Sequence, residues 1–221
     1  LSFRGLYEVF AKPTKFFAEL AARPKILVPL IVLAVILLVM LFATRDLIYQ
    51  SQVTSPQFQA QLQGRAITPE MEAQFKSRIV EFGAVTILLC SLIAALFALF
   101  WGNFVFAGKA GFKQLWSVML YGEIVWGVGV LIGVPIHLAR QNLVAPFSLG
   151  ILAASKGLDS VLYVILARFD IFIIWEIIVI GIGLSAVYGL TRGRGLRLSL
   201  LSMGMCSVLL ILFTIIGKLI F

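Results

Sequence analysis

Five long apolar segments constrain the fold of this 221-residue chain more than any other feature. A helix rises 1.5 Å per residue, so about 20 mostly apolar residues are needed to cross the roughly 30 Å hydrocarbon core of a bilayer. The expected fold class is therefore all-α: one polytopic membrane helical bundle over residues 1–221, with five transmembrane helices and short interfacial amphipathic helices. The expected spans cover residues 26–44, 82–106, 116–137, 171–191 and 198–217.

The composition agrees with a membrane protein. Hydrophobic residues make up 61% of the chain and charged residues 13%, whereas about a quarter of the residues in soluble domains are charged. The net charge of +8 comes from lysines and arginines concentrated at the ends of the apolar segments, which is typical of cytoplasmic loops. We therefore expect anionic lipids of the inner leaflet as partners, and no nucleic acid.

The segments outside the spans differ in character. Residues 1–25 predict an amphipathic interfacial helix, which either lies on the membrane or packs on the bundle. Residues 45–81 begin as a glutamine-rich outer loop, and from Thr68 an N-cap followed by proline predicts a helix that runs into the second span. Residues 138–170 are apolar but too short to cross twice, and the sequence leaves open whether this interfacial connection is re-entrant.

Positive charges give the orientation. With the N-terminus inside, the inner segments carry ten lysines and arginines and the outer segments eight. The inner loops are shorter, and the densest cluster, TRGRGLR, lies between the last two spans. We expect a multi-pass protein of the cell membrane, of the bacterial cytoplasmic type, with its N-terminus inside and its C-terminus outside.

Small residues spaced four apart indicate where helices approach closely in lipid. They should form the core of the bundle. These residues are Ala94, Ala98 and Gly102 in the second span, Gly129 and Gly133 in the third, and Gly181, Ser185 and Gly189 in the fourth.

Two glutamates lie inside predicted spans, where a charged side chain costs at least about 2.5 to 3.5 kcal/mol. Glu123 is about six residues from the inner end of its span, and Glu176 is about six residues from the outer end of its own. This places them in opposite leaflets, roughly 12 Å apart along the membrane normal. Glu176 should then lie level with His137, and Glu123 within reach of inner cations.

Two interpretations of the glutamates remain open. In the first, they line a polar path for a proton, ion or small solute. In the second, each glutamate forms a buried pair that fixes the contacts between helices. The candidate residues for either role are Glu123, Glu176, His137, Asp170, Arg140 and Arg168.

The inner loops provide a second set of candidates. Arginines separated by glycines suit lipid phosphates or a partner protein, although topology alone also explains them. These candidates are Arg192, Arg194, Arg197, Lys109 and Lys113. The chain lacks a Walker loop, a nucleophile elbow and a zinc-protease motif, and its two cysteines lie inside separate spans. We expect no enzyme activity, no catalytic residues, no cofactor and no metal site.

Several stretches resemble the Ypt-interacting-protein (Yip) family of five-span membrane proteins. These are KPTKFFAEL, RPKILVP and above all FDIFIIWEIIVIGIGLS, in which Asp170, Phe172, Trp175 and Gly183 match the pattern of the family's fourth span. The resemblance implies a membrane protein of a family that includes eukaryotic trafficking proteins associated with Rab-type GTPases. The chain looks like a bacterial-type member without the long soluble N-terminal region, so GTPase binding stays open.

The leading hypothesis is an adaptor or organiser of membrane proteins or lipids that has no catalytic chemistry. The alternative is a small transporter or channel for protons, ions or a small solute that uses Glu123 and Glu176. Other membrane proteins and a second copy of the chain are further candidate partners.

Overall fold

A computed structural model describes residues 4–158 and 160–220, and within this part of the chain all regular elements are helical. Five helices are long and apolar enough to cross a membrane. The expected all-α bundle with five transmembrane helices is thus confirmed. The five are α3 (Leu27–Val53), α5 (Pro69–Phe100, continued by the π-helical turn η1, Trp101–Val105), α6 (Phe112–Arg140), α8 (Ile171–Tyr188) and α9 (Arg192–Ile220).

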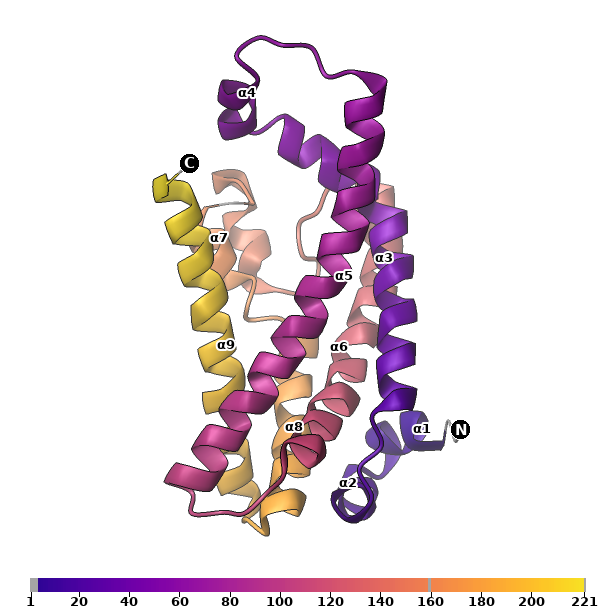
Figure 1. Cartoon of the computed structure of the whole chain (residues 1–221), viewed down its shortest axis with the longest axis vertical. Coiled ribbons are helices and arrows are strands. Elements are labelled where there is room, and N and C mark those ends of the chain that lie inside the picture. Colours follow the sequence, from indigo (N-terminus) through magenta and orange to yellow (C-terminus); the bar gives the residue numbers. More distant parts are fainter. Residues whose placement is uncertain (1–3, 159, 221) are drawn as a thin grey trace.

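The five long helices form a closed ring. In order around the ring, α3 contacts α6, α6 contacts α8, α8 contacts α9, α9 contacts α5, and α5 returns to α3. Helix α5 crosses the bundle obliquely and also packs on α6 (Figure 1). Helix α6 is the most enclosed, and its inner half contributes the fully buried Leu115, Val118, Met119, Leu120 and Val125.

The short helices lie at opposite ends of the ring. Helices α1 (Arg4–Ala11) and α2 (Pro13–Ala22) are at the end that carries the α8–α9 turn, and α4 (Pro56–Leu62) is at the other end with the C-terminus (Figure 1). Because the chain runs along the bundle five times, an odd number, its two termini lie at opposite ends. We call the end with α1 and α2 the inner end and the opposite end the outer end.

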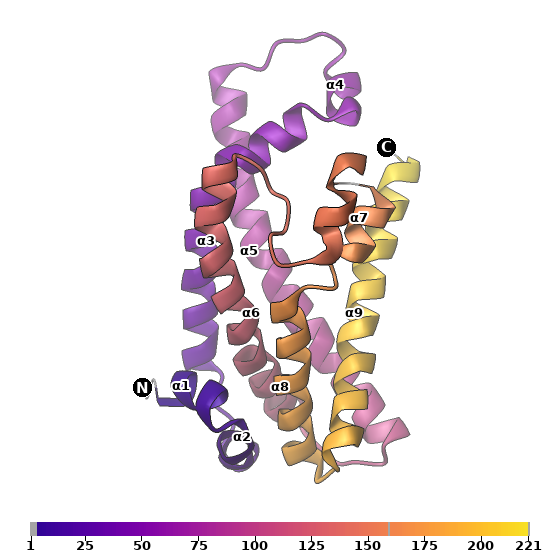
Figure 2. The same cartoon turned by 180° about the vertical axis from the view of Figure 1, so that it is seen from behind.

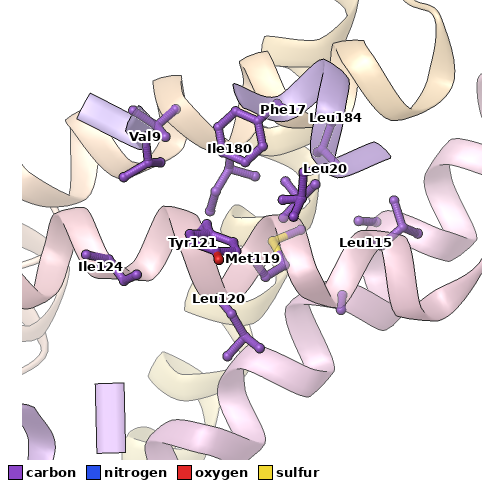
Figure 3. Close-up of a cluster of buried hydrophobic side chains, with 14 of the residues drawn as sticks. Val9, Phe17, Leu20, Leu115, Met119, Leu120, Tyr121, Ile124, Ile180 and Leu184 are labelled. Atoms are coloured by element: carbon purple, nitrogen blue, oxygen red, sulfur yellow. The ribbon is translucent and has the colours of Figure 1, made fainter. Parts of the chain in front are cut away.

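The N-terminal helices pack on the bundle rather than lying free on its surface. Phe17 is fully buried, and a methyl group placed on Gly183 of α8 would lie 2.9 Å from its ring and 2.5 Å from Val118 of α6. Figure 3 shows Phe17 and neighbouring side chains of α2 facing apolar residues of α6 and α8. Of the two placements that the sequence left open, packing on the bundle accounts for the apolar face of α2.

Hydrogen bonds hold the end of this segment in place. The buried Ser117 hydroxyl of α6 accepts the Lys25 N–H at 3.1 Å and donates to the Lys25 carbonyl at 2.8 Å. The Gln114 side chain of α6 donates to the Ala21 carbonyl at 2.8 Å. The chain therefore enters α3 from a fixed position.

Most of the small residues lie at helix contacts as expected. Ala94 and Ala98 of α5 are buried, and a methyl group on Gly181 would lie 2.9 Å from the Leu196 Cα on α9. A methyl group on Gly129 of α6 would meet the Phe172 ring of α8. Gly189 has a different role, since it is exposed and ends α8 with a left-handed φ of 64°.

The outer polar region is more helical than the sequence suggests. Helix α5 begins at the Thr68 cap, as expected, but α3 continues to Val53 where a loop is predicted after residue 45. The two helices support each other beyond the apolar core. Lys76 of α5 forms ion pairs of 2.7 Å with Asp46 of α3 and 2.6 Å with Glu72 of α5, and it lies over the Tyr49 ring.

The connection between α6 and α8 lies beside the long helices rather than above them. Helix α8 has 18 residues, or about 27 Å, against 29 residues in each of α6 and α9. The space between the outer end of α8 and the outer end of the bundle is occupied by two short helices, η2 (Leu149–Lys156) and α7 (Val161–Leu166). They lie at the level of the outer turns of α9 (Figure 2). Asp170 ends this connection and caps α8 by accepting the Phe172 N–H at 2.8 Å.

Candidate functional site

The glutamates of α6 and α8 lie at nearly the same level. Methyl groups placed on Gly122 and Gly129 of α6 would meet the side chains of Ile180 and Phe172 of α8, which fixes the register of this antiparallel pair. Glu176 lies midway between Ile180 and Phe172 in sequence, so it is level with about residue 125 or 126 of α6. Its level differs from that of Glu123 by only about 4 Å along the helix axis.

The predicted separation in opposite leaflets is therefore wrong. Two features shift the levels of the glutamates: α6 begins at Phe112 instead of residue 116, and the outer end of α8 is set back by the connection that precedes it. The carboxyl groups of Glu123 and Glu176 interact electrostatically across the α6–α8 contact. Glu176 is 4% exposed and Glu123 is half-buried.

Neither glutamate forms an ion pair among the described residues. The neighbour of Glu123 is the hydroxyl group of Ser91 on α5, which also accepts a 2.9 Å hydrogen bond from the Trp116 indole. Lys109 and Lys113 are exposed at the inner end. Within the described residues, Glu123 does not form the expected pair with a lysine or arginine of the inner loops.

Both cysteines interact electrostatically with Glu123, and a cation lies beside the cysteines. The Cys206 thiol of α9 lies 3.8 Å from the Cys90 carbonyl of α5, and both cysteines interact electrostatically with Arg168 of the outer connection. The Arg168 Nε is buried without a hydrogen-bond partner in the described part of the chain. We define the interior polar cluster as Cys90, Ser91, Glu123, Arg168, Glu176 and Cys206.

The sequence gives no sign of some members of this cluster. Cys90, Ser91 and Cys206 look like packing residues, because isolated small polar side chains are common in membrane helices. Only the register of α5 and α9 against α6 brings them to Glu123. Among the described residues, no group of three or more histidine, cysteine, aspartate and glutamate side chains is placed to hold a metal ion.

His137 belongs to a different place. It lines a cavity of about 210 Å³ near the outer end, together with Asp170 and Phe172, and its Nδ1 lies 3.0 Å from the Asn142 carbonyl oxygen. The level of Glu176 is about 12 residues further inward on α6, or roughly 18 Å, so the expected pair with His137 does not form. Arg140 is exposed at the end of α6.

The basic candidates of the inner loops are exposed at the inner end. The Arg192 guanidinium contacts the Thr14 hydroxyl of α2 at 3.4 Å, and the Arg197 Nε contacts the Gly193 carbonyl at 3.4 Å. Within the described residues, these two arginines, Arg194 and the two lysines form no ion pair. Their charges face outward from the inner end.

A ring of five apolar helices with acidic groups inside defines an α-helical, multi-pass membrane protein. The Yip1 domain family model matches residues 7–215, and the chain belongs to this family. A curated relative, membrane protein YknW of Bacillus subtilis (strain 168), is 25% identical over 196 residues, which cover 86% of this chain and 81% of the relative. No solved structure matches the chain significantly.

Proposed function

We propose that this Yip1-family membrane protein is an adaptor that organises other membrane proteins or lipids without catalysing a reaction. The observation that supports this role is the concentration of unpaired positive charge at the inner end. We define the inner basic surface by its exposed cations, which form no ion pair within the described residues. It comprises Lys12, Lys15, Lys109, Lys113, Arg192, Arg194 and Arg197.

A fixed position makes these charges suitable for association. Helix α2 is held by its buried phenylalanines and by the hydrogen bond from Gln114, while the Arg192–Thr14 contact connects it with the α8–α9 turn. Each cation close to an anionic membrane surface contributes about 1 kcal/mol of attraction. Acidic segments of a partner protein near the membrane would be attracted in the same way.

The role requires the inner end to face the cytoplasm. We propose that the N-terminus is inside and the C-terminus outside in the bacterial cell membrane. The basic α8–α9 turn supports this orientation, because short cytoplasmic loops gather lysine and arginine.

Site-specific photocrosslinking in intact cells tests the adaptor role. A photoreactive residue at Lys15 should give a discrete protein or lipid adduct, and the same residue at Gln61 of the outer helix α4 serves as the matched control. Replacement of Arg192, Arg194 and Arg197 by glutamine should remove the adduct at unchanged protein abundance. An adduct that persists in this variant, or no adduct from the inner end at all, contradicts the proposal.

The interior polar cluster favours a second candidate function, transport of protons or small cations. Glu123 and Glu176 interact inside the ring without forming an ion pair, and such intramembrane carboxyl groups commonly mark ion or proton paths. In a transporter of this kind, the path for the proton or cation lies between α5, α6, α8 and α9. The connection with Arg168 would then close its outer side.

Flux measurements separate the two functions. Purified protein in liposomes is tested for proton and monovalent cation flux, together with Glu123→Gln and Glu176→Gln and with the exposed control Glu81→Gln. Transport predicts flux that both interior variants abolish and that the control retains. Flux at the level of empty liposomes removes the transport candidate, whereas crosslinking through the inner basic surface is unaffected by this result.

A further inference from the structure

A cavity at the inner end lies outside both the interior polar cluster and the inner basic surface. It has a volume of about 490 Å³ and is open on one side, which is within the range of small-molecule sites. Three parts of the chain line it: α1, α2 with the segment before α3, and the inner half of α6 through Tyr121. Its charged and aromatic lining residues are Arg4, Glu8, Phe16, Glu19, Arg23, Lys25 and Tyr121.

Only some of the charged side chains around this cavity form ion pairs within the protein. Arg4 and Glu8 form an ion pair with an Nε–Oε1 distance of 2.6 Å. Glu19, Arg23 and Lys25 form no ion pair among the described residues. Around the same opening, the cavity thus offers two cations without an ion pair and the Glu19 carboxylate, which interacts with Arg4 electrostatically but does not form an ion pair with it. This arrangement suits a ligand that itself carries an anion and a cation.

The framework of the cavity is rigid. Lys25 is fixed through its backbone by the two hydrogen bonds to Ser117. The lining also contains the Phe16 and Tyr121 rings, whose centroids are 4.7 Å apart in an edge-to-face contact. Gly5 of α1 leaves room for both rings, because a methyl group there would lie 2.8 Å from Phe16 and 3.1 Å from the Tyr121 hydroxyl.

We propose that this cavity binds the phosphoethanolamine headgroup of a membrane phospholipid. The phosphate diester carries one negative charge and contacts Arg23 and Lys25, which donate charge-assisted hydrogen bonds. The primary ammonium group donates to the Glu19 carboxylate. A choline headgroup cannot donate this hydrogen bond, since its nitrogen has no hydrogen, and a glycerol headgroup offers Glu19 no ammonium group.

The location fits a lipid that remains in the membrane. Lys25 lies two residues before the start of the spanning helix α3, so the cavity is at the depth where lipid phosphates lie. The first turns of α3 expose Leu27 and Ile31, which are 60% and 47% accessible, to the surrounding acyl chains. The inference goes beyond the adaptor role because it concerns a single, selective site rather than the inner basic surface.

Native mass spectrometry of the purified full-length protein tests the proposal. The protein is titrated with phosphatidylethanolamine, phosphatidylcholine and phosphatidylglycerol of identical acyl chains. Phosphatidylethanolamine should bind about fivefold more tightly than either competitor, which corresponds to about 1 kcal/mol. Glu19→Gln should abolish this preference, and the double variant Arg23→Gln with Lys25→Gln should weaken binding of all three lipids.

Matched controls define the outcomes. Arg65→Gln, an exposed cation of the outer loop that belongs neither to the cavity nor to the inner basic surface, should keep the wild-type preference. Equal binding of the three lipids, or the same loss in Arg65→Gln as in Glu19→Gln, would overturn the proposal. Soluble phosphoethanolamine distinguishes the two sources of the headgroup: if it competes as well as the lipid, the ligand is a free metabolite and the lipid assignment is wrong. Crosslinking through Arg192, Arg194 and Arg197 tests the adaptor role separately.

Discussion

At the scale of single residues, several close contacts between helices depend on glycine. Gly183 lies where α2, α6 and α8 meet, and no side chain fits between Val118 and Phe17 at this point. Gly204 of α9 is equally apolar in context, but it is exposed and has no neighbour within 4 Å of an added methyl group. These two positions allow the effect of packing to be separated from the effect of helix propensity.

We expect Gly183→Ala to lower the stability of the protein by about 1 to 3 kcal/mol, because the methyl group forces Phe17 or Val118 to move in a dense core. Gly204→Ala should be neutral or slightly stabilising, since alanine favours the helix and meets nothing. Thermal unfolding of both variants in the same detergent measures the difference. Equal melting temperatures would contradict the packing described for Gly183.

The unusual side chains are evident from the sequence, but their neighbours in the structure are not. Glu123 and Glu176 stand out because carboxylates are rare in apolar segments. Their interaction depends on the levels of α6 and α8 relative to each other, which change when a span begins four residues earlier or is shortened by the connection before it. Arg168 is one of the candidates that the sequence offers for a polar path or buried pair, but its burial beside the cysteines follows from how the outer connection folds.

At the scale of elements, hydropathy predicted the five spans, and cap residues predicted the start of α5. The continuation of α3 to Val53 could not be predicted from the glutamine-rich sequence, since it is stabilised by tertiary contacts with Lys76 and Phe75 of α5. Tertiary packing overrides local propensity at such places. The position of α2 depends on contacts of the same kind.

The Ser117 hydroxyl group contributes to the attachment of the N-terminal helices through its two hydrogen bonds to the Lys25 backbone. Ser117→Ala leaves the Lys25 N–H and carbonyl without their partner, which costs about 1 to 3 kcal/mol for groups of this kind. We expect faster amide hydrogen exchange in α1 and α2, with α8 and α9 unchanged. Ser207→Ala is the control, because the Ser207 side chain makes no hydrogen bond in the described part of the chain. Identical exchange in both variants would contradict this attachment.

At the scale of the whole molecule, the ring separates two different ends. The inner end carries α1, α2 and the inner basic surface, whereas the outer end carries α4 and the ion pairs around Lys76 (Figure 1). This polarity, together with the positive-inside bias, supports a single orientation in the membrane.

Cysteine labelling in whole cells tests the orientation. In a background with Cys90→Ala and Cys206→Ala, a membrane-impermeant maleimide should label Gln61→Cys in intact cells. Lys15→Cys should be labelled only after the membrane is permeabilised. Both positions are exposed, so access alone decides the result. The reverse pattern would invert the proposed topology and remove the basis of the cytoplasmic adaptor role.

The short length of α8 has a consequence for membrane insertion. Helix α8 has only 18 residues, and it carries a buried carboxyl group that is costly to expose to lipid. Gly181 packs against Leu196 of α9 across a turn of only three residues, Gly189 to Thr191. We therefore expect the two helices to leave the translocon together as a hairpin, so that Glu176 is already covered by a neighbouring helix when it first meets the bilayer.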